Sequence, residues 1–572
     1  MNMSRHLHCA AAVLPLLLTA CGGDSASPVA NAPPAAGTPP VASAPPQLAK
    51  AEGATLLACS ALTAMGLPNT RVTSAAVVPA GMLGTQQAPE HCLVQGLMHE
   101  RTGINGNYAI GFEMRLPKAW NGRFFYQANG GADGTVSTAV GESGPGTDTT
   151  ALSMGFAVLS SDAGHNGAQN NIGPDHFGLD PQARLDYGYQ AVGKLTPMGR
   201  QVVNAAYGKV PDRMYMGGCS NGGRHAMVAA SRYADQYDGI LAGNPGFNLP
   251  KSAIQVAWDT LWLNTVAEST AKLSTAVTAT ELNLVADRVL ARCDALDGLK
   301  DGMVLDVQAC QTTFKLDLDV PTCTGARDGS CLSTAQKTAL GKIFGGAKNA
   351  AGMALYASFP YDPGMRTGGW SVWKYFINTT LGAGAMPYIF TTPANALAPN
   401  ALVNGLLNYS METDAPKISA VDGLFTESAM SFMTPPNADR LFPLRDRGAK
   451  LMVYHGTADP VFSSNDTADW YAALRKTHGE DTANFARYYP VAGMNHCSGG
   501  VATDRFDMLT ALVDWVEDGR APNQITAAVR PANTDLASTG WSSARTRPLC
   551  PFPKVARYQG GNTESAASFS CE

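Results

Sequence analysis

The feature that most constrains this chain is the pentapeptide Gly218–Gly222, which reads Gly-Cys-Ser-Asn-Gly. It follows a short apolar run, Met214–Met216, and precedes a segment with helical character that begins at Arg224. A serine held between glycines on a sharp strand-to-helix turn is typical of a nucleophile elbow, where larger residues would clash with the turn. A glycine-rich turn around a serine also occurs by chance. Ser220 is therefore a candidate nucleophile that needs partners elsewhere in the chain.

Two partners follow in the chain. Asp459 lies just beyond the apolar run Lys450–Gly456, which predicts a buried strand. His496 lies in a loop after a second strand-like run, Phe485–Pro490. The order Ser, Asp, His along the chain is that of the α/β-hydrolase fold, so we predict a catalytic triad of Ser220, Asp459 and His496.

Other acids and histidines are weaker candidates. Asp466 and Asp469 lie on an amphipathic helical segment, which predicts that they face solvent. His455 lies inside the predicted strand and is expected to be packed there. His165 precedes the serine, against the expected order, and is interpreted as a structural histidine of a turn.

Short apolar segments alternate with helical ones on both sides of the elbow. Arg184–Tyr207 predicts an amphipathic helix just before it. This alternation predicts a mainly parallel sheet flanked by helices. The strand-like segments before Asp459 are Val72–Val78, Tyr108–Leu116, Gly122–Gln127, Gly155–Asp162 and Tyr237–Gly246.

The alternation stops over residues 247–436, which contain long helical stretches and no clear buried strand. With 572 residues the chain is long for one core, so an insertion is expected. We predict a catalytic domain of residues 51–246 and 437–572. A mostly helical lid of residues 247–436 is inserted in it, between the nucleophile strand and the acid strand, and shapes the substrate pocket.

The N-terminus resembles a bacterial lipoprotein signal. Residues 1–20 combine Arg5 with a short apolar core, and small residues precede Cys21. An ordinary cleaved signal is the alternative. Residues 21–50 are rich in Pro and Ala, which predicts an extended tether. Twelve cysteines indicate an oxidising compartment, and the net charge of −5 gives no indication of nucleic-acid binding.

Cysteines flank both candidate catalytic residues. Cys219 precedes Ser220 and Cys497 follows His496. If the serine and histidine are within hydrogen-bonding reach, their neighbours are close enough for a disulfide. We predict a Cys219–Cys497 bond that holds the histidine loop against the elbow. Without Cys9 and Cys21 the chain has ten cysteines, and spacing does not determine the other pairs.

Two further loops carry candidate site residues. Asn129–Gly134 is a glycine-rich turn after a predicted strand, where an α/β-hydrolase places one oxyanion donor, although an ordinary turn fits equally well. Asp294, Asp297 and Asp301 lie three and four residues apart among glycines. Such carboxylates either bind a hard cation such as calcium or remain in a solvated loop.

Four segments together resemble the tannase and feruloyl esterase family, and the resemblance extends from about residue 55 to the C-terminus. They are Gly218–Gly223, Cys293–Gly302, Pro490–Gly500 and Arg545–Pro551. The resemblance implies the same triad, with the backbone amides of Gly131 and Asn221 as oxyanion donors. It implies calcium bound by the side chains of Asp294, Asp297 and Asp301 and the carbonyls of Leu299 and Met303. It also implies the pairs Cys59–Cys92, Cys293–Cys310, Cys323–Cys331 and Cys550–Cys571 beside Cys219–Cys497.

The resemblance also implies the activity, which is that of a secreted serine esterase for small aromatic esters. The expected substrate is mono(2-hydroxyethyl) terephthalate, and hydroxycinnamate or gallate esters are the alternative. Trp373 and Phe462 match aromatic residues of the substrate pocket, and Trp370 adds to the aromatic content of the lid. Asn221 departs from the glutamate of terephthalate-ester hydrolases, and the segment 374–400 departs from the part of their lid that binds the substrate carboxylate.

The remaining expectations concern partners and location. We expect a monomer without a redox cofactor, which the N-terminal segment predicts to be secreted or anchored in the bacterial periplasm or outer membrane through a lipid on Cys21. A different class is a non-catalytic surface lipoprotein on a calcium-stabilised hydrolase scaffold. An intact triad argues against that class.

Overall fold

The computed structural model describes residues 46–84, 86–142, 144–146, 149–170 and 175–572. The chain divides into two units, Met1–Ala44 and Pro45–Glu572, and the described residues belong to the second. The predicted signal peptide, Cys21 and nearly all of the tether lie outside the described residues. Within them, no helix combines the length and the apolar character needed to cross a membrane.

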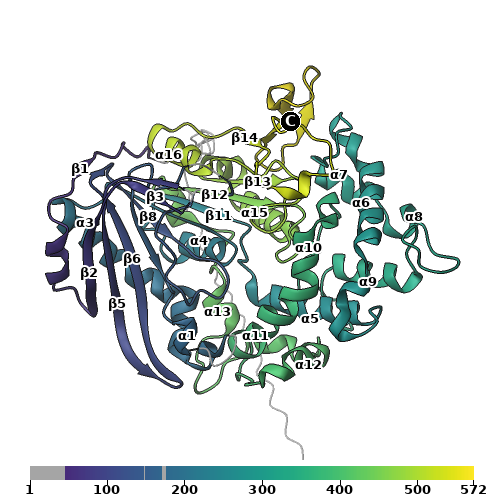
Figure 1. Ribbon diagram of the computed structural model, residues 1–572, viewed down its shortest axis with the longest axis horizontal. Helices are drawn as coiled ribbons and strands as arrows, with labels where there is room; N and C mark the ends of the chain where they lie inside the picture. Colours follow the sequence, from purple (N-terminus) through teal and green to yellow (C-terminus); the bar gives the residue numbers. More distant parts are fainter. Residues whose placement is uncertain (1–45, 85, 143, 147–148, 171–174) are drawn as a thin grey trace, which may run out of the picture. The chain divides into compact units, whose positions relative to one another are not determined.

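A nine-stranded sheet, the largest among the described residues, forms the centre of the fold (Figure 1). Its order is β13-β12-β11-β10-β8-β9-β6-β5-β2. Strands β13 to β9 pair in parallel, and β6, β5 and β2 continue the sheet antiparallel. The predicted mainly parallel sheet is confirmed. The strands are β2 Thr70–Val78, β5 His91–Gly103, β6 Gly106–Pro117, β8 Arg123–Gln127, β9 Ala157–Ser161, β10 Arg213–Cys219, β11 Gly239–Gly243, β12 Lys450–Gly456 and β13 Ala486–Val491.

Helices cover both faces of the sheet, which is why its central strands are apolar throughout. Successive residues of a strand point to opposite faces. Phe124 therefore packs into one core with α3 (Ala191–Tyr207), α4 (Asn221–Arg232) and α15 (Ser464–His478). Its neighbour Phe125 packs into a second core with α16 (Met508–Asp518). The predicted helix before the elbow is α2 (Pro181–Leu185), a π-helical turn (Asp186–Gln190) and α3.

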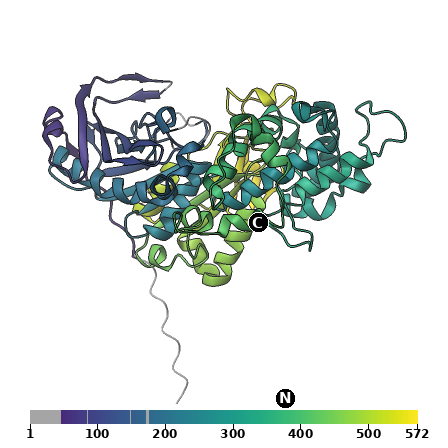
Figure 2. The ribbon, with the colours of Figure 1, turned by 90° about the horizontal axis from the view of Figure 1, so that it is seen from below.

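Residues 247–436 form helices and carry none of the named strands of the described chain (Figure 2). Residues from Leu263 to Trp370 include a core of their own, with Leu282 and Leu340, whereas others such as Phe390 and Phe432 pack into the first core of the sheet. They belong to the same compact unit as the sheet, so a separate lid domain stays a prediction. We call residues 247–436 the lid segment. Its α-helices are α5 Leu249–Asn264, α6 Ala279–Cys293, α7 Val307–Thr313, α8 Leu316–Asp319, α9 Thr334–Phe344, α10 Gly368–Val372, α11 Ala383–Ala385, α12 Leu402–Leu407 and α13 Ala429–Met433.

Smaller elements complete the fold. The additional strands pair antiparallel as β1 with β7, β3 with β4, β14 with β15 and β16 with β17. Their bounds are β1 Ala54–Thr55, β3 Gly81–Leu83, β4 Gln86–Ala88, β7 Ala119–Trp120, β14 Ile525–Ala528, β15 Thr546–Leu549, β16 Ala556–Tyr558 and β17 Phe569–Cys571, and the short helices are α1 Gly167–Asn170 and α14 Phe442–Asp446.

Five disulfides join the ten cysteines of the described residues. One of them, Cys219–Cys497, spans 278 positions of the sequence and is the pair expected from the triad. The other four match the pairs that the family resemblance implies. They are Cys59–Cys92, Cys293–Cys310, Cys323–Cys331 and Cys550–Cys571.

Candidate active site

Ser220 lies on the tight turn between β10 and α4, with φ 66° and ψ −125°. This strained backbone is typical of a nucleophile elbow. The turn leaves no room for a side chain two residues before or two residues after the serine. A Cβ at Gly218 would lie 2.2 Å from the Ala128 carbonyl oxygen, and one at Gly222 would lie 2.3 Å from it. The two glycines are therefore required by close backbone approach.

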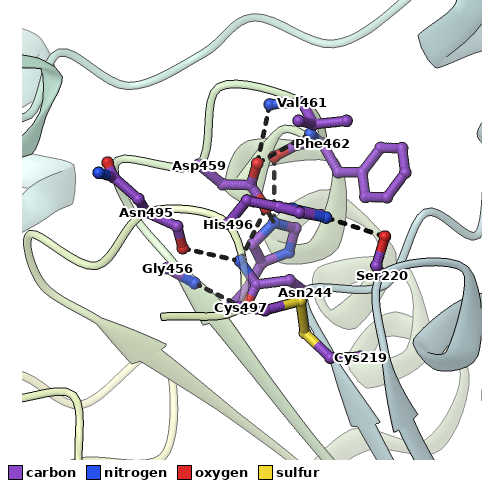
Figure 3. Close-up of a disulfide and its surroundings, with 11 residues drawn as sticks. Cys219, Ser220, Asn244, Gly456, Asp459, Val461, Phe462, Asn495, His496 and Cys497 are labelled. Carbon is purple, nitrogen blue, oxygen red and sulfur yellow. Dashed lines mark hydrogen bonds and ion pairs between the residues drawn. A yellow bond between two sulfur atoms is a disulfide. The ribbon is translucent and has the colours of Figure 1, made fainter. Parts of the chain in front are cut away.

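His496 joins Ser220 to Asp459 (Figure 3). Its Nε2 lies 2.8 Å from Ser220 Oγ, and its Nδ1 lies 2.8 Å from Asp459 Oδ2. Ser220 follows β10, Asp459 follows β12 and His496 follows β13. They meet because parallel strands end at the same edge of the sheet. A hydroxyl, an imidazole and a carboxylate linked by hydrogen bonds in this order form the arrangement that activates a serine for nucleophilic attack.

Asp459 is fixed by several donors. The backbone amides of Val461 and Phe462 donate to its Oδ1 at 2.8 and 3.2 Å. Burial alone would raise the pKa of Asp459, but the adjacent His496 and His455 bring that pKa well below its ordinary value. The carboxylate therefore stays ionised and can stabilise an imidazolium at His496.

Two contacts of Asp459 are not evident from the sequence. Asn244, which follows β11, donates from Nδ2 to Asp459 Oδ2 at 2.7 Å and to the Asn495 carbonyl at 3.2 Å. His455 is buried as expected, but its Nε2 also lies 3.3 Å from Asp459 Oδ2. The position of Asn244 at the end of a strand was the available signal, because β11 lies between β10 and β12.

The other candidate residues, Asp466, Asp469 and His165, have surroundings that differ from those of the triad. Asp466 accepts two hydrogen bonds from Asn248 Nδ2, both at 3.0 Å, and is partly buried, so the prediction that it faces solvent is wrong. The amphipathic pattern could not show that Asn248, from a distant segment, covers it. Asp469 is exposed. His165 is fully buried and stacks on Phe177 with a centroid separation of 3.6 Å, as a structural histidine would.

The Cys219–Cys497 disulfide joins the elbow directly to the histidine loop (Figure 3). The two Cα atoms lie 6.0 Å apart, within the usual range. The lid segment holds the same loop from another side, since Asp362 Oδ2 accepts from the Gly493 amide at 3.2 Å. The position of His496 therefore depends on a covalent bond and on lid contacts together.

Aromatic rings flank His496. Its ring centroid lies 4.8 Å from that of Trp373 in the lid segment and 5.3 Å from that of Phe462, both in edge-on geometry. Trp370 is only 3% exposed and packs in the core of the lid segment, so it adds no exposed wall. Lys374 is buried and pairs with Asp259 at 2.6 Å, so its ammonium is not free to bind a substrate carboxylate.

The candidate oxyanion residues, Gly131 and Asn221, come from two separate segments near Ser220. Asn221 is the first residue of α4, so its amide belongs to the helix end whose N–H groups lack helical acceptors. Gly131 lies in the loop 129–134 after β8, and a Cβ built there would meet no atom within 4 Å. A Cβ at the preceding Gly130 would lie 3.7 Å from Ser220 Cβ. This loop therefore passes beside the candidate nucleophile.

The aspartate loop gives a mixed result as a metal site. No group of three or more His, Cys, Asp or Glu side chains in the described part of the chain is arranged to hold a metal ion. Asp301 pairs with Arg547, whereas the buried Asp297 has one carboxylate oxygen, Oδ2, without a hydrogen-bond partner. Burial and the neighbouring Asp301 and Asp294 raise the pKa of Asp297 to about 7. The unpartnered oxygen fits a cation, and the pairing of Asp301 does not.

Comparisons with known proteins identify the family. Residues 92–572 match the family model described as tannase and feruloyl esterase. The chain is 40% identical to mono(2-hydroxyethyl) terephthalate hydrolase of Piscinibacter sakaiensis over 84% of this chain and 85% of that protein. It is 29% identical to a probable feruloyl esterase of Arthroderma benhamiae, over 82% and 83% of the two chains.

Solved structures show the same fold. The crystal structure of feruloyl esterase B from Aspergillus oryzae has a TM-score of 0.71 at 24% identity and covers 90% of this chain and 99% of its own. The tannin acyl hydrolase from Aspergillus niger has a TM-score of 0.65 at 18% identity and covers 90% and 95%. The chain therefore belongs to the tannase and feruloyl esterase family, a family of carboxylic ester hydrolases.

Proposed function

We propose that this protein is a serine esterase in which Ser220, His496 and Asp459 carry out the reaction. The observation that carries the proposal is the continuous hydrogen-bonded row from Ser220 Oγ through His496 to Asp459, with both bonds at 2.8 Å. Hydrolysis of p-nitrophenyl acetate tests the activity directly. It also distinguishes an esterase from a non-catalytic binding lipoprotein on the same scaffold, which would release no nitrophenol.

The proposed reaction follows from the position of each group. His496 takes the proton of Ser220 while the serine oxygen attacks the ester carbonyl, and Asp459 holds the imidazole in the required tautomer. The backbone amides of Gly131 and Asn221 stabilise the tetrahedral oxyanion. His496 then returns the proton to the leaving alcohol. A water molecule, activated by the same histidine, releases the acid from the acyl-enzyme and restores Ser220.

The proposed substrates are small esters of aromatic acids. Trp373 and Phe462 beside His496 provide aromatic edges that favour a planar acyl group. Mono(2-hydroxyethyl) terephthalate is the first candidate because the relative that is 40% identical carries that name. Hydroxycinnamate and gallate esters are the alternative, and the burial of Lys374 favours them, because that lysine cannot pair with a second substrate carboxylate.

We expect kcat/KM for mono(2-hydroxyethyl) terephthalate or methyl ferulate to exceed that for ethyl octanoate by at least about tenfold, because an aromatic pocket selects ring shape over a flexible chain. The three substrates are compared side by side under one condition. Trp373→Ala should lower the ratio of kcat/KM between the aromatic ester and the octanoate ester by about two- to tenfold, the usual value of one aromatic contact. A preference for the octanoate ester would refute the aromatic pocket, and a preference for ferulate would change only the substrate.

We also propose that calcium binds at the aspartate loop, held by Asp294, Asp297 and Asp301 with the carbonyls of Leu299 and Met303. The support is the unpartnered, buried Oδ2 of Asp297. Mixed carboxylate and carbonyl oxygens suit calcium better than magnesium. The ion would supply positive charge to a buried acidic loop, a structural role, and Arg547 would have to share Asp301 with it.

Chelation is expected to lower the Tm of the purified protein, and calcium is expected to restore it in preference to magnesium, because an ion that binds only the folded state stabilises it. Asp297→Asn has opposite expected effects on the loop without calcium and with calcium. It should raise the Tm in the presence of chelator, by removing an unpartnered buried charge, and abolish the response to calcium. Asp328→Asn, at an exposed position, is the control. An unchanged calcium response in Asp297→Asn would contradict the proposed site.

We propose further that the protein is exported. Five disulfides are typical of proteins that fold in an oxidising compartment. The signal-like N-terminus and the lipid anchor on Cys21 belong to the same proposal and rest on the sequence alone.

A further inference from the structure

The two proposed oxyanion donors come from segments that are far apart in the sequence. Gly131 belongs to the loop 129–134, and Asn221 opens α4. An oxyanion hole works only if both amides are held at the correct separation before the substrate arrives. Backbone contacts fix the loop in part, since the Asp133 amide donates to the Gly130 carbonyl at 3.3 Å. No backbone hydrogen bond among the described residues joins residues 129–134 to α4, so the direct hydrogen bonds between them come from side chains.

Asp133 provides a direct link between the two segments. Its Oδ2 accepts one hydrogen bond from Asn221 Nδ2 at 2.7 Å and another from His225 Nε2 at 2.9 Å. The side chain of Asp133 is 2% exposed, and Asn221 and His225 are 2% and 3% exposed. Buried hydrogen bonds of this kind are costly to break, because the groups left behind find no water.

Arg224 extends the link. It donates from Nε to Asn221 Oδ1 at 2.6 Å and from its terminal nitrogens to the carbonyls of Gly188 and Tyr187 at 2.7 and 2.9 Å. Both ends of the Asn221 amide are therefore engaged, and its side chain is held by the protein instead of facing the ester. A terminal nitrogen of Arg224 also lies 3.2 Å from Nδ1 and 3.0 Å from Nε2 of His225, so Arg224 contacts both partners of Asp133.

The links close into a ring. Tyr187 donates from its hydroxyl to the carbonyl of Gly131 at 3.3 Å. The path runs from Gly131 through Tyr187 and Arg224 to Asn221, and from Asn221 through Asp133 back to the loop that contains Gly131. Each proposed oxyanion residue is thus attached to the same buried network. A network with two discrete attachment points fixes their separation better than either contact alone.

We propose that Asp133 is a positioning residue that sets the oxyanion hole, by tying the Gly131 loop to the first turn of α4 through Asn221 and His225. This inference rests on the proposed esterase function and adds a residue to it. Asp133 does not touch the substrate or the reacting atoms. It acts by holding the amides of Gly131 and Asn221 where the tetrahedral oxyanion forms.

The bonds of Asp133 also determine which substitution should preserve them. Both use the same acceptor, Oδ2, so a neutral group with one acceptor oxygen in that place can make both. Burial raises the pKa of Asp133 to about 8, against the opposing effects of Arg224 and of the hydrogen bond from Asn221. The neutral acid is therefore accessible near neutral pH, and asparagine is its closest mimic. Alanine removes the acceptor altogether.

The first test is the steady-state kinetics of Asp133→Ala and Asp133→Asn with p-nitrophenyl acetate. Asp133→Ala should lower kcat about 10- to 100-fold, the usual effect of a small misplacement of catalytic groups, and change KM by less than about threefold, because only the transition state loses stabilisation. Asp133→Asn should restore kcat to within about threefold of wild type. The matched control is Asp238→Ala, which removes another buried aspartate. Asp238 lies just before β11, at the end of that strand away from Asn244.

The second readout separates positioning from general loss of structure. An aryl boronic acid forms a tetrahedral adduct with the serine oxygen and places a boron hydroxyl in the oxyanion hole, whereas a free aromatic carboxylate, such as benzoate, binds without covalent change. Asp133→Ala should weaken the boronic acid by a factor similar to its loss in kcat/KM and leave the affinity for benzoate within about threefold. Asp238→Ala should lower the Tm without changing either affinity.

Different outcomes contradict the esterase proposal and the positioning role of Asp133. Inactive wild-type protein, or full activity in Ser220→Ala, refutes the esterase proposal itself. With active wild-type protein, the Asp133 inference is overturned if Asp133→Ala keeps its kcat, if its whole loss is in KM, or if Asp133→Asn is as impaired as the alanine variant. Should Asp133→Ala fail to fold, Asn221→Ala breaks the same bond from the other side and keeps the backbone amide. It is expected to show the same split between kcat and KM.

Discussion

Ser220→Ala is expected to lower kcat/KM for p-nitrophenyl acetate by at least about 10⁴-fold, because loss of the nucleophile removes the covalent route and leaves only residual stabilisation by the oxyanion hole. The fold should survive the change. Alanine is smaller than serine and occupies the same strained position on the elbow, where Ser220 has φ 66°. The Tm of the variant should therefore stay within a few degrees of wild type.

A matched control is available on the helix that follows. Ser231 lies on α4, and its hydroxyl has no hydrogen-bond partner among the described residues. Ser231→Ala should keep wild-type kcat and KM, which would show that loss of a hydroxyl on the following helix is harmless. If Ser220→Ala instead retains more than about one hundredth of the activity, Ser220 is not the nucleophile.

Replacing Cys219 and Cys497 together with alanine is expected to lower the free energy of unfolding by about 2–5 kcal/mol, because the bond restricts a long segment of the unfolded chain. The bond spans 278 positions, the longest separation among the five. The kcat should also fall by about tenfold or more, since the loop that carries His496 loses its covalent anchor beside Ser220. Denaturant unfolding without reductant measures the first effect and steady-state kinetics the second.

The lid segment offers the control for this double variant. Cys323–Cys331 closes only 8 positions and lies in residues 247–436, so its removal should destabilise the protein less and leave kcat unchanged. Equal kinetic effects of the two double variants would contradict a specific role of Cys219–Cys497. Peptide mapping of the oxidised wild-type protein that pairs Cys219 with another cysteine would contradict the bond itself.

The residues at strand ends were predictable because local patterns define them. The elbow motif identified Ser220, and the strand before Asp459 is Lys450–Gly456, the segment expected from its apolar run. Parallel strands bring their carboxyl ends to one edge, so the order of the motifs was enough to place the three candidate residues together. The same reasoning placed Cys219 opposite Cys497.

What the sequence could not show depends on contacts between distant segments. Asn244 contacts Asp459 only because β11 lies between β10 and β12 in the sheet. In the sequence, Asp133 is one polar residue of a glycine-rich turn, and its link to Asn221 spans 88 positions. The pairing of Asp301 with Arg547 spans 246 positions and could not be read from the spacing of the aspartates.

The most direct test of the central proposal is covalent labelling of the wild-type protein with a p-nitrophenyl alkylphosphonate, followed by intact-mass analysis and peptide mapping. Such a reagent reacts with a serine that is activated by a neighbouring base and mimics the tetrahedral intermediate. We expect one phosphonyl group per chain, on the peptide that contains Ser220, with loss of activity in proportion to labelling and no labelling of Ser220→Ala. A phosphonyl group on another residue, or full inactivation without modification of Ser220, would contradict the account.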